Sequence, residues 1–447
     1  MAMHRPLPPA DCADLPGGYA DREALARELR LRFPTAAKLD GGLSPIRGGR
    51  RAAERQLLAL DPVRYGRSRN FLDGAVTGLS PYVRHGVLGL AEFKRNLLTR
   101  LRHWNDGAKL ISELAWRDFW QRVWLQRGDA ISLDLEPLKT GHDPSAYAPE
   151  LPADLTAAAT GLACIDTFSR QLLSIGWLHN HARMWLAAYV VHWRRCSWQA
   201  GARWFLQHLL DGDPASNNLS WQWVASSFSA KPYIFNRENL EKYAGDRFCG
   251  GCAAAAQCPF DASYEQLAAQ LFNNATTIPA NTITASTSTT SAAPPPLGAT
   301  TVNPQQPLLW IHAEGLGPAN PVWQAWPEAP ALFVFDQARI AADGTGLKRL
   351  GFVAESLLEL PVVVRQGDPL QELLAFAQRC GCDGVVSQEP LDPHLRRICA
   401  ALQQQMPLQL LPAPAFVDLP NTASLQRFNR YWKQAEPLLR KQFSGAC

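Results

Sequence analysis

The chain has 447 residues, of which 47% are hydrophobic and 19% charged, as in a soluble globular protein of two or three domains. No run of about 18 uncharged apolar residues could span a bilayer, and the first residues lack the apolar core of a secretion signal, so we expect a cytoplasmic protein without membrane contact. Ten cysteines in such a chain predict reduced thiols or metal ligands instead of a disulfide framework.

The formal net charge of +4 is unevenly distributed. Residues 1–272 hold 32 Lys and Arg against 27 Asp and Glu, whereas residues 273–447 hold 12 against 13. The positive excess in the first part favours a polyanion as partner. A random imbalance of surface charge explains it equally well.

An uncharged segment divides the chain. Residues 273–306 consist largely of Thr, Ser, Ala, Asn and Pro. Such a segment buries too little apolar surface to offset the entropy of ordering, so we expect a flexible linker. The linker separates a first domain, residues 1–272, from a second domain, residues 307–447.

The first domain is predicted to be all-α. Apolar and aromatic residues recur at three- and four-residue steps, without an alternating strand. Eleven of the fifteen tryptophans lie here, and most are expected in the core because a large ring is an ordinary helix-packing residue. The predicted helices are residues 86–103, 108–127, 164–176, 178–195 and 198–210.

The second domain shows short apolar runs that alternate with helical stretches. This alternation of strands and helices predicts an α/β, doubly wound, Rossmann-like parallel sheet, with ligand sites at the carboxyl ends of the strands. No GxGxxG motif is present, so ordinary dinucleotide binding is not predicted. The expected elements are strands Leu308–His312, Leu332–Phe335, Val362–Arg365, Gly384–Ser387 and Leu408–Leu411, and helices Leu370–Cys380 and Pro393–Gln404.

Several short segments combine groups that carry chemistry. Ser80, at the cap of a helix whose first residue is Pro81, marks a helix start, and such starts can hold phosphates. On their own, most Ser-Pro caps bind nothing. Near residue 116, helical spacing places a carboxylate, a guanidinium and flat rings on one face, although a surface ion pair beside core aromatics would give the same pattern. The face consists of Glu113, Trp116, Arg117 and Trp120.

Two further segments complete the set. Asn180, Arg183, Met184 and Ala187 share a helical face, and nothing there has metal-ligand spacing. Residues 211–224 place tryptophans beside amides and carboxylates, a mixture that suits a flavin site built for electron transfer.

In order and interval, these segments resemble the flavin domain of the photolyase and cryptochrome family over residues 45–265. The motifs are GLSPY, ELAWRDFW, GWLHNHARM and LDGDPASNNLSWQW. The resemblance implies bound FAD, with Thr77 and Ser80 at its phosphates, Asp213 at the polar edge of the ribityl or isoalloxazine and Asn217 at N5. The full implied set is Tyr65, Thr77, Ser80, Arg117, Arg183 paired with Asp211, Asp213 and Asn217.

The resemblance also implies an activity, light-driven splitting of a pyrimidine dimer flipped out of DNA by one electron from reduced FAD. Trp116 and Trp223 would hold the flipped bases, Glu113 would hydrogen-bond the dimer, and Asn180 would sit between flavin and substrate. Where relatives that repair the 6-4 photoproduct carry a histidine pair, this chain has Asn180 and Met184. The expected substrate is therefore DNA containing cyclobutane dimers, and the expected catalytic residues are Glu113, Trp116, Asn180, Met184 and Trp223.

An electron relay in this family uses three tryptophans. Trp221 and Trp198 match the inner two, and the outer one is missing. Either Tyr147, Trp193 or Trp204 takes the place of the outer tryptophan, or the electron relay ends at another group.

The cysteines suggest a second cofactor. Cys249 and Cys252 form a CxxC followed by Cys258-Pro259, a spacing of both iron-sulfur and zinc sites. It resembles the carboxyl end of bacterial photolyases with a [4Fe-4S] cluster, whose fourth ligand corresponds to Cys164. The gap from Cys252 to Cys258 is shorter than in that group. A zinc site or metal-free thiols stay open, with Cys196 as a reserve ligand.

The second domain resembles the antenna domain of the same family, placed after the flavin domain where relatives have it first, as in a circular permutation. The antenna chromophore is not predicted. We therefore expect a monomeric deoxyribodipyrimidine photo-lyase. The alternatives are a cryptochrome-type blue-light photoreceptor without repair, or a non-catalytic nucleic-acid-binding module whose cluster serves folding.

Overall fold

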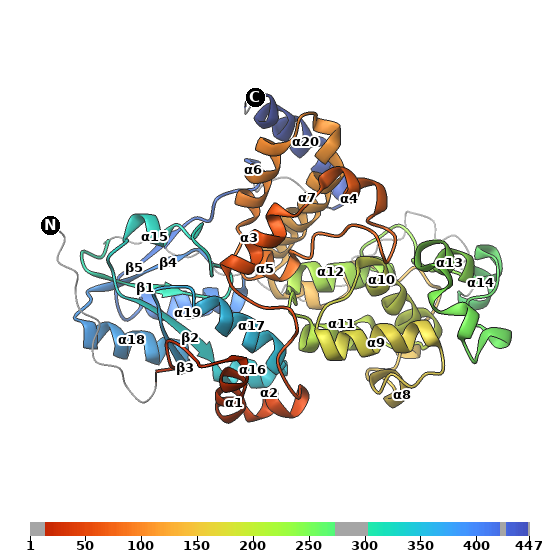
Figure 1. The fold of residues 1–447 in the computed structure, drawn as a ribbon, viewed down its shortest axis with the longest axis horizontal. Coiled ribbons are helices and arrows are strands. Elements are labelled where there is room, and N and C mark those ends of the chain that lie inside the picture. Colours follow the sequence, from red (N-terminus) through yellow and green to blue (C-terminus); the bar gives the residue numbers. More distant parts are fainter. Residues whose placement is uncertain (1–13, 273–302, 421–425, 446–447) are drawn as a thin grey trace.

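The computed structural model describes residues 14–272, 303–420 and 426–445. The predicted linker lies outside the described residues, apart from 303–306. A helical half and an α/β half lie side by side (Figure 1). The helices of the first half are α1 Arg22–Arg32, α2 Pro34–Leu39, α3 Arg50–Leu58, α4 Pro62–Ser68, α5 Ser80–Arg84, α6 Leu90–Arg100, α7 Trp104–Arg127, α8 Ala153–Thr156, α9 Ala163–Ile175, α10 Asn180–Ala188, α11 Trp198–His208, α12 Pro214–Ala225, α13 Arg237–Ala244 and α14 Tyr264–Leu271.

The predicted helical character of the first half is confirmed. The five segments expected to be helical coincide with α6, α7, α9, α10 and α11, although α7 begins four residues earlier than expected and α9 one residue earlier. Helix α7 is the longest of them, because Asp106 caps its first turn and Gly128, at φ +55°, ends it. The expected cap at Ser80 is wrong by one residue: Leu79 is the N-cap, and Ser80 and Pro81 are the first two helical residues. Proline fits there because the first N–H groups of a helix have no intrahelical partner.

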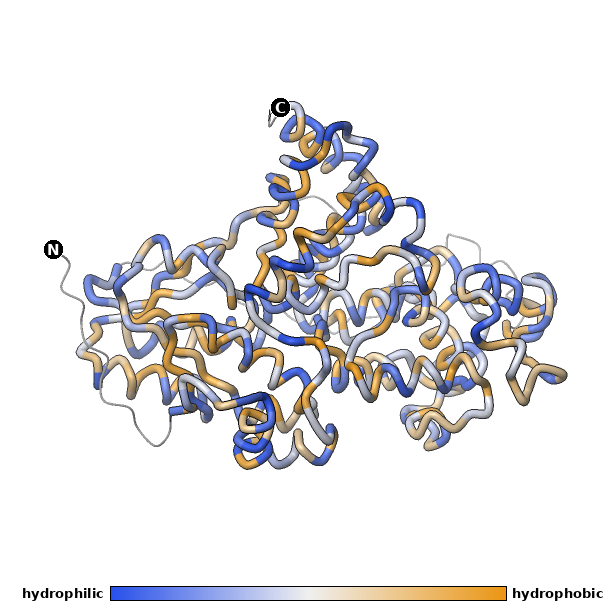
Figure 2. Tube along the Cα trace, viewed as in Figure 1, coloured by the Kyte–Doolittle hydropathy of each residue, from blue (hydrophilic) through white to orange (hydrophobic). Residues whose placement is uncertain are grey.

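The second half contains a five-stranded parallel sheet of order β3-β2-β1-β4-β5, which confirms the doubly wound prediction. Strands β1 and β4 are buried along their whole length, which explains why β1 reads as a continuous apolar run (Figure 2). Strand β4 ends in two buried polar residues, Ser387 and Gln388. The register pairs Leu309 with Ala331 on one side and with Val386 on the other. The elements are β1 Pro307–Ile311, α15 Val322–Ala325, β2 Ala331–Asp336, α16 Gln337–Asp343, α17 Leu347–Leu357, β3 Val363–Gly367, α18 Pro369–Cys380, β4 Gly384–Gln388, α19 Pro393–Gln403 and β5 Leu408–Leu411.

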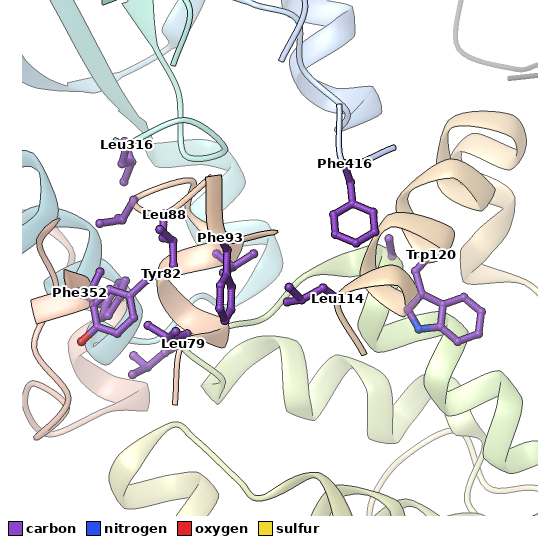
Figure 3. Packing of buried hydrophobic residues seen from close by; sticks show 14 of the residues in the cluster. Leu79, Tyr82, Leu88, Phe93, Leu114, Trp120, Leu316, Phe352 and Phe416 are labelled. Atoms are coloured by element: carbon purple, nitrogen blue, oxygen red, sulfur yellow. The ribbon is translucent and has the colours of Figure 1, made fainter. Parts of the chain in front are cut away.

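Helix α17 joins the two halves. Nine of its eleven residues are buried, which is expected only for a helix covered on nearly all sides. Phe352 of α17 packs against Tyr82 of α5, with ring centroids 5.1 Å apart. Figure 3 shows the two rings side by side, with Leu79 and Leu88 of the helical half nearby. The halves therefore share one hydrophobic cluster.

Both ends of the described chain cross to the other half. At the start, the Leu15 N–H donates to the Val364 carbonyl of β3 at 2.8 Å, and α1 packs on α17. At the end, α20, Phe428–Ser444, leaves the sheet and packs on α7 of the helical half (Figure 1). None of the described helices is long and apolar enough to cross a bilayer.

A buried ion pair lies in the contact between the halves. Lys348 of α17 donates to Asp40, and Nδ1 of His208 lies 3.4 Å from the same carboxylate. All three residues are at most 5% exposed. Burial alone would raise the pKa of Asp40, but the hydrogen bonds to His208 and Lys348 outweigh burial and hold this pKa below its usual value.

We expect Lys348→Met to lower the free energy of unfolding by about 3–5 kcal/mol at pH 7, because it leaves a buried carboxylate without its ammonium partner. Urea denaturation measures the change, with Lys38→Met on an exposed site of α2 as control. Asp40 has a folded-state pKa below the unfolded value, so its contribution is present above about pH 4 and is lost as the pH falls through the folded pKa. An unchanged urea midpoint would contradict the assignment.

Candidate active site

A cavity of about 540 Å³ lies inside the helical half, a volume within the ordinary range of cofactor sites. It is lined from α5, α7, α10, α11 and α12 and by the segments beside them. The lining is a mixture of flat rings and polar side chains. Thirteen of the residues expected to act in catalysis, electron transfer or cofactor binding line it: Tyr65, Thr77, Ser80, Glu113, Trp116, Arg117, Asn180, Arg183, Met184, Asp211, Asn217, Trp221 and Trp223.

Helix α7 presents one face to this cavity. Its lining residues include Glu113, Trp116 and Trp120, which are separated by helical steps of three and four. Glu113 pairs with Arg69 at 3.0 Å and with Lys109 at 2.8 Å. These cations fix the carboxylate at the cavity wall and balance its charge, so Glu113 can accept a further hydrogen bond without standing as an isolated buried anion.

Helices α10 and α12 supply the opposite polar groups. Arg183 donates to Asp211 at 2.8 Å and, through Nε, to the Leu178 carbonyl at 3.0 Å. The Asn217 amide donates to the Ala202 carbonyl at 3.0 Å and to Asn218 Oδ1 at 3.1 Å. Both amide hydrogens of Asn217 are thus committed, which leaves Oδ1 as an acceptor for an N–H of a ligand.

Asp213 is not among the residues that line the cavity. It is 2% exposed, caps α12 by accepting from the Ser216 N–H at 2.9 Å, and lies 3.6 Å from Arg117 and 3.7 Å from Arg84. Burial opposes its ionisation, but Arg117, Arg84 and the hydrogen bonds from Ser216 outweigh burial and hold the pKa of Asp213 below its usual value. Asp213 therefore fixes Arg117 and the start of α12 from behind the cavity wall.

The expected relay residues Trp221 and Trp198 line two different cavities. Trp221 lines the first cavity, whereas Trp198 lines a second one, with its indole N–H donating to Asp134 at 2.6 Å. Tyr147 belongs to the same hydrophobic cluster and its hydroxyl lies 2.8 Å from Thr140 Oγ1. All three rings are buried. Another buried ring, Trp204, lies beside Phe205, which contacts Trp221 edge-on at 4.9 Å.

The four cysteines singled out in the sequence line a third, small cavity between α9 and the segment after α13. Burial raises the pKa of Cys164 to about 12, and burial together with Glu241 raises that of Cys249 to about 11. Without a metal both would be protonated thiols. Among the described residues, no three His, Cys, Asp or Glu side chains form a group spaced to hold a metal ion.

The second cavity, of about 530 Å³, opens between the two halves at the carboxyl ends of β1 and β2. Its lining includes Trp310, Phe335 and Asp336 from the sheet and Trp198 from α11. Glu314 also lines it, and burial raises the pKa of this carboxyl to about 7. The switch of strand order between β1 and β4 is the expected place for a ligand in such a sheet.

Residues 110–244 match the family model described as the FAD binding domain of DNA photolyase. This segment carries α7, α10 and α12, whose faces form the first cavity. The helical half is therefore similar, over this segment, to the FAD-binding domain of the photolyase and cryptochrome family. Its cavity fits FAD by volume, by its rings and by the amide and guanidinium groups on its wall, and within this photolyase-type domain those residues are the ones that would hold the cofactor.

Curated relatives cover part of the chain. A deoxyribodipyrimidine photo-lyase of Streptomyces griseus is 38% identical over 154 residues, which cover 34% of this chain and 32% of the relative. That of Synechococcus is 32% identical over 268 residues, 54% of this chain and 53% of the relative. The chain thus spans about half or less of their length. A solved class III photolyase from Agrobacterium tumefaciens is 24% identical, with a TM-score of 0.40 over 50% of this chain and 54% of that chain.

Sequence patterns missed part of this photolyase-type site. Trp177 lines the cavity and donates its indole N–H to Ser80 Oγ at 3.2 Å. Arg69 and Lys109 reach the same wall, and Arg69 comes from the end of α4, which packs on α7. Lys109 could have been found, because it lies one helical turn before Glu113. The position of Arg69 depends on the packing of α4 and has no sequence signal.

We expect Arg183→Ala to weaken FAD binding about tenfold or more, because it leaves Asp211, which is 8% exposed, unpaired at the cavity wall. The flavin absorbance retained after gel filtration and a titration of the apoprotein with FAD measure the effect. Arg170→Ala, at an exposed site of α9, should keep the wild-type flavin content. If the two variants retain equal amounts of flavin, Arg183 does not take part in FAD binding.

Proposed function

We propose that this chain is a light-driven DNA repair lyase, a deoxyribodipyrimidine photo-lyase that acts on cyclobutane pyrimidine dimers. One observation carries the proposal: Glu113, Trp116, Asn180, Met184 and Trp223 line the same cavity as the residues suited to hold FAD. When bound, reduced FAD supplies, on absorbing blue light, the electron that opens the dimer and takes it back afterwards.

The side chains on the cavity wall have separate roles in the proposed reaction. Trp116 and Trp223 offer flat faces on which the two extruded pyrimidines can stack, and a damaged pair leaves the duplex at low cost because its stacking is already broken. Glu113, held by Arg69 and Lys109, accepts a hydrogen bond from an N–H of the dimer, and the two cations beside it stabilise the negative charge that the added electron brings. Lys109 is half exposed and can also contact a DNA phosphate.

A cryptochrome-type photoreceptor is the second candidate. Two features favour a sensor: the chain lacks the outer tryptophan of the relay, and the α/β half follows the helical half in the chain. A pure sensor has no need for dimer-holding groups on the cavity wall. Their presence together favours the lyase.

We further propose that Cys164, Cys249, Cys252 and Cys258 hold a [4Fe-4S] cluster. The structural support for the cluster is the cavity that the four cysteines share, and the CxxC spacing suits a [4Fe-4S] cluster as well as zinc.

The order of the two halves is proposed to be a circular permutation, with domain limits near 1–272 and 307–447. In support, the segment before α3 packs on α17 while α20 packs on α7, so each half holds a chain end that belongs with the other. Chain ends and exposed connections are the places where permutation is tolerated. The cavity at the carboxyl ends of β1 and β2 is the proposed antenna-type site, with its pigment unassigned.

Photoreduced wild-type protein should repair a dimer-containing oligothymidylate under blue light. The recovery of thymine absorbance measures this repair. Glu113→Ala should slow this repair about 10- to 100-fold, the effect of losing a hydrogen bond to a charged group, while the flavin stays bound. Glu54→Ala, at an exposed site of α3, should repair at the wild-type rate. Absence of repair by wild-type protein that carries reduced FAD would favour the photoreceptor.

Cys258→Ser should remove most of the iron and acid-labile sulfide from protein purified without oxygen, because one thiolate ligand is lost. Cys382→Ser, in the turn after α18, should leave both at the wild-type level. Zinc in place of iron in the wild-type protein would overturn the cluster assignment.

A further inference from the structure

The carboxyl-terminal helix α20 reaches the proposed substrate site from behind. Its first residue, Phe428, stacks face to face on Trp116, with ring centroids 3.8 Å apart and planes 7° apart. Phe428 is 8% exposed and is not among the residues that line the 540 Å³ cavity, whereas Trp116 does line it. Phe428 thus covers one face of the Trp116 indole, and the uncovered part of the ring lines the cavity.

Three aromatic neighbours, Phe428, Phe119 and Trp120, fix the orientation of the Trp116 indole. Phe119, on α7, meets Trp116 edge-on at 5.9 Å and meets Phe428 edge-on at 5.8 Å. Trp120 lies 5.0 Å from Trp116 at an angle of 41° and also lines the cavity. A flat ring held on one face and one edge loses its rotamer freedom before a ligand arrives.

Helix α20 is itself held by polar anchors. The Tyr431 hydroxyl donates to the Asp118 carboxylate at 2.7 Å, and Arg427 pairs with Glu136 at 2.6 Å. Farther along, Phe443 packs on Trp104, with centroids 6.1 Å apart. The segment before α20 belongs to the same cluster, where Phe416 points toward Leu114 and Trp120 (Figure 3). The two polar anchors beside Phe428, at Arg427 and Tyr431, fix the place of its ring independently of any ligand and of the distant Phe443 contact.

From this geometry we propose that Phe428 is a positioning residue for substrate binding, which orients Trp116 so that its free face receives a flipped pyrimidine. The proposal rests on the proposed dimer-binding function. Phe428 does not touch the substrate. An aromatic pair of this kind is worth enough beyond its buried area to change an affinity roughly three- to tenfold.

The test compares Phe428→Leu with Phe443→Leu in the FAD-loaded full chain. Both variants keep an apolar side chain on α20, but only the first removes the ring that stacks on Trp116. Binding to an oligothymidylate with one cyclobutane dimer is measured in the dark by fluorescence anisotropy. The tryptophan exciton band in far-ultraviolet circular dichroism reports the geometry of Trp116 and Trp120 without any substrate.

Phe428→Leu should raise the Kd for the damaged oligonucleotide roughly three- to tenfold and reduce the exciton band, with the rate of repair at saturation kept within about twofold. Phe443→Leu should match the wild type in both readouts, and Phe428→Tyr, which keeps the ring, should restore both. Equal behaviour of Phe428→Leu and Phe443→Leu, or tighter binding by Phe428→Leu, would overturn the proposal. Wild-type protein that does not prefer damaged DNA would instead refute the proposed function, while the exciton band would still test the stack.

Discussion

Burial of α17 between the two halves is the constraint on which the rest of the structure depends. A helix covered on nearly all sides cannot be exposed without a large loss of apolar burial, so the sheet and the helical half are held as one body. The Asp40–Lys348 pair lies in this contact and makes it specific, because any displacement would leave a buried charge alone. The same contact closes one side of the second cavity.

The exchange of chain ends follows from this contact. The segment before α3 needs α17 and β3 to bury its apolar side, and α20 needs α7, so neither half is complete as a stretch of sequence. Through α20 the far end of the chain supports a ring on the wall of the proposed active site. Stability and site geometry are therefore coupled through α7, which carries Glu113 and Trp116 on one face and contacts α20 along its length.

Charges around the flavin-type cavity are paired within the protein before any ligand binds. Arg183 holds Asp211, Asp213 lies beside Arg117 and Arg84, and Arg69 and Lys109 hold Glu113. Pairing of this kind orients the dipoles of the site in advance, so little reorganisation is needed when charge moves between a cofactor and a substrate. The thiols of the third cavity are the exception, because burial raises the pKa values of Cys164 and Cys249, so the proposed metal would have to displace their protons.

The sequence by itself determined the type and rough limits of seven helices and all five strands, and the faces of α7 and α10 that line the cavity, because helical and strand periods are local properties. It also singled out four cysteines that line one cavity. It did not single out α12, α17 or α20 as helices. Only the tertiary structure decided that Asp213 lies behind the wall, that Arg69 reaches Glu113 and that Phe428 stacks on Trp116. Each of these depends on how distant elements pack, and residues 116 and 428 share no local pattern through which their contact could be predicted.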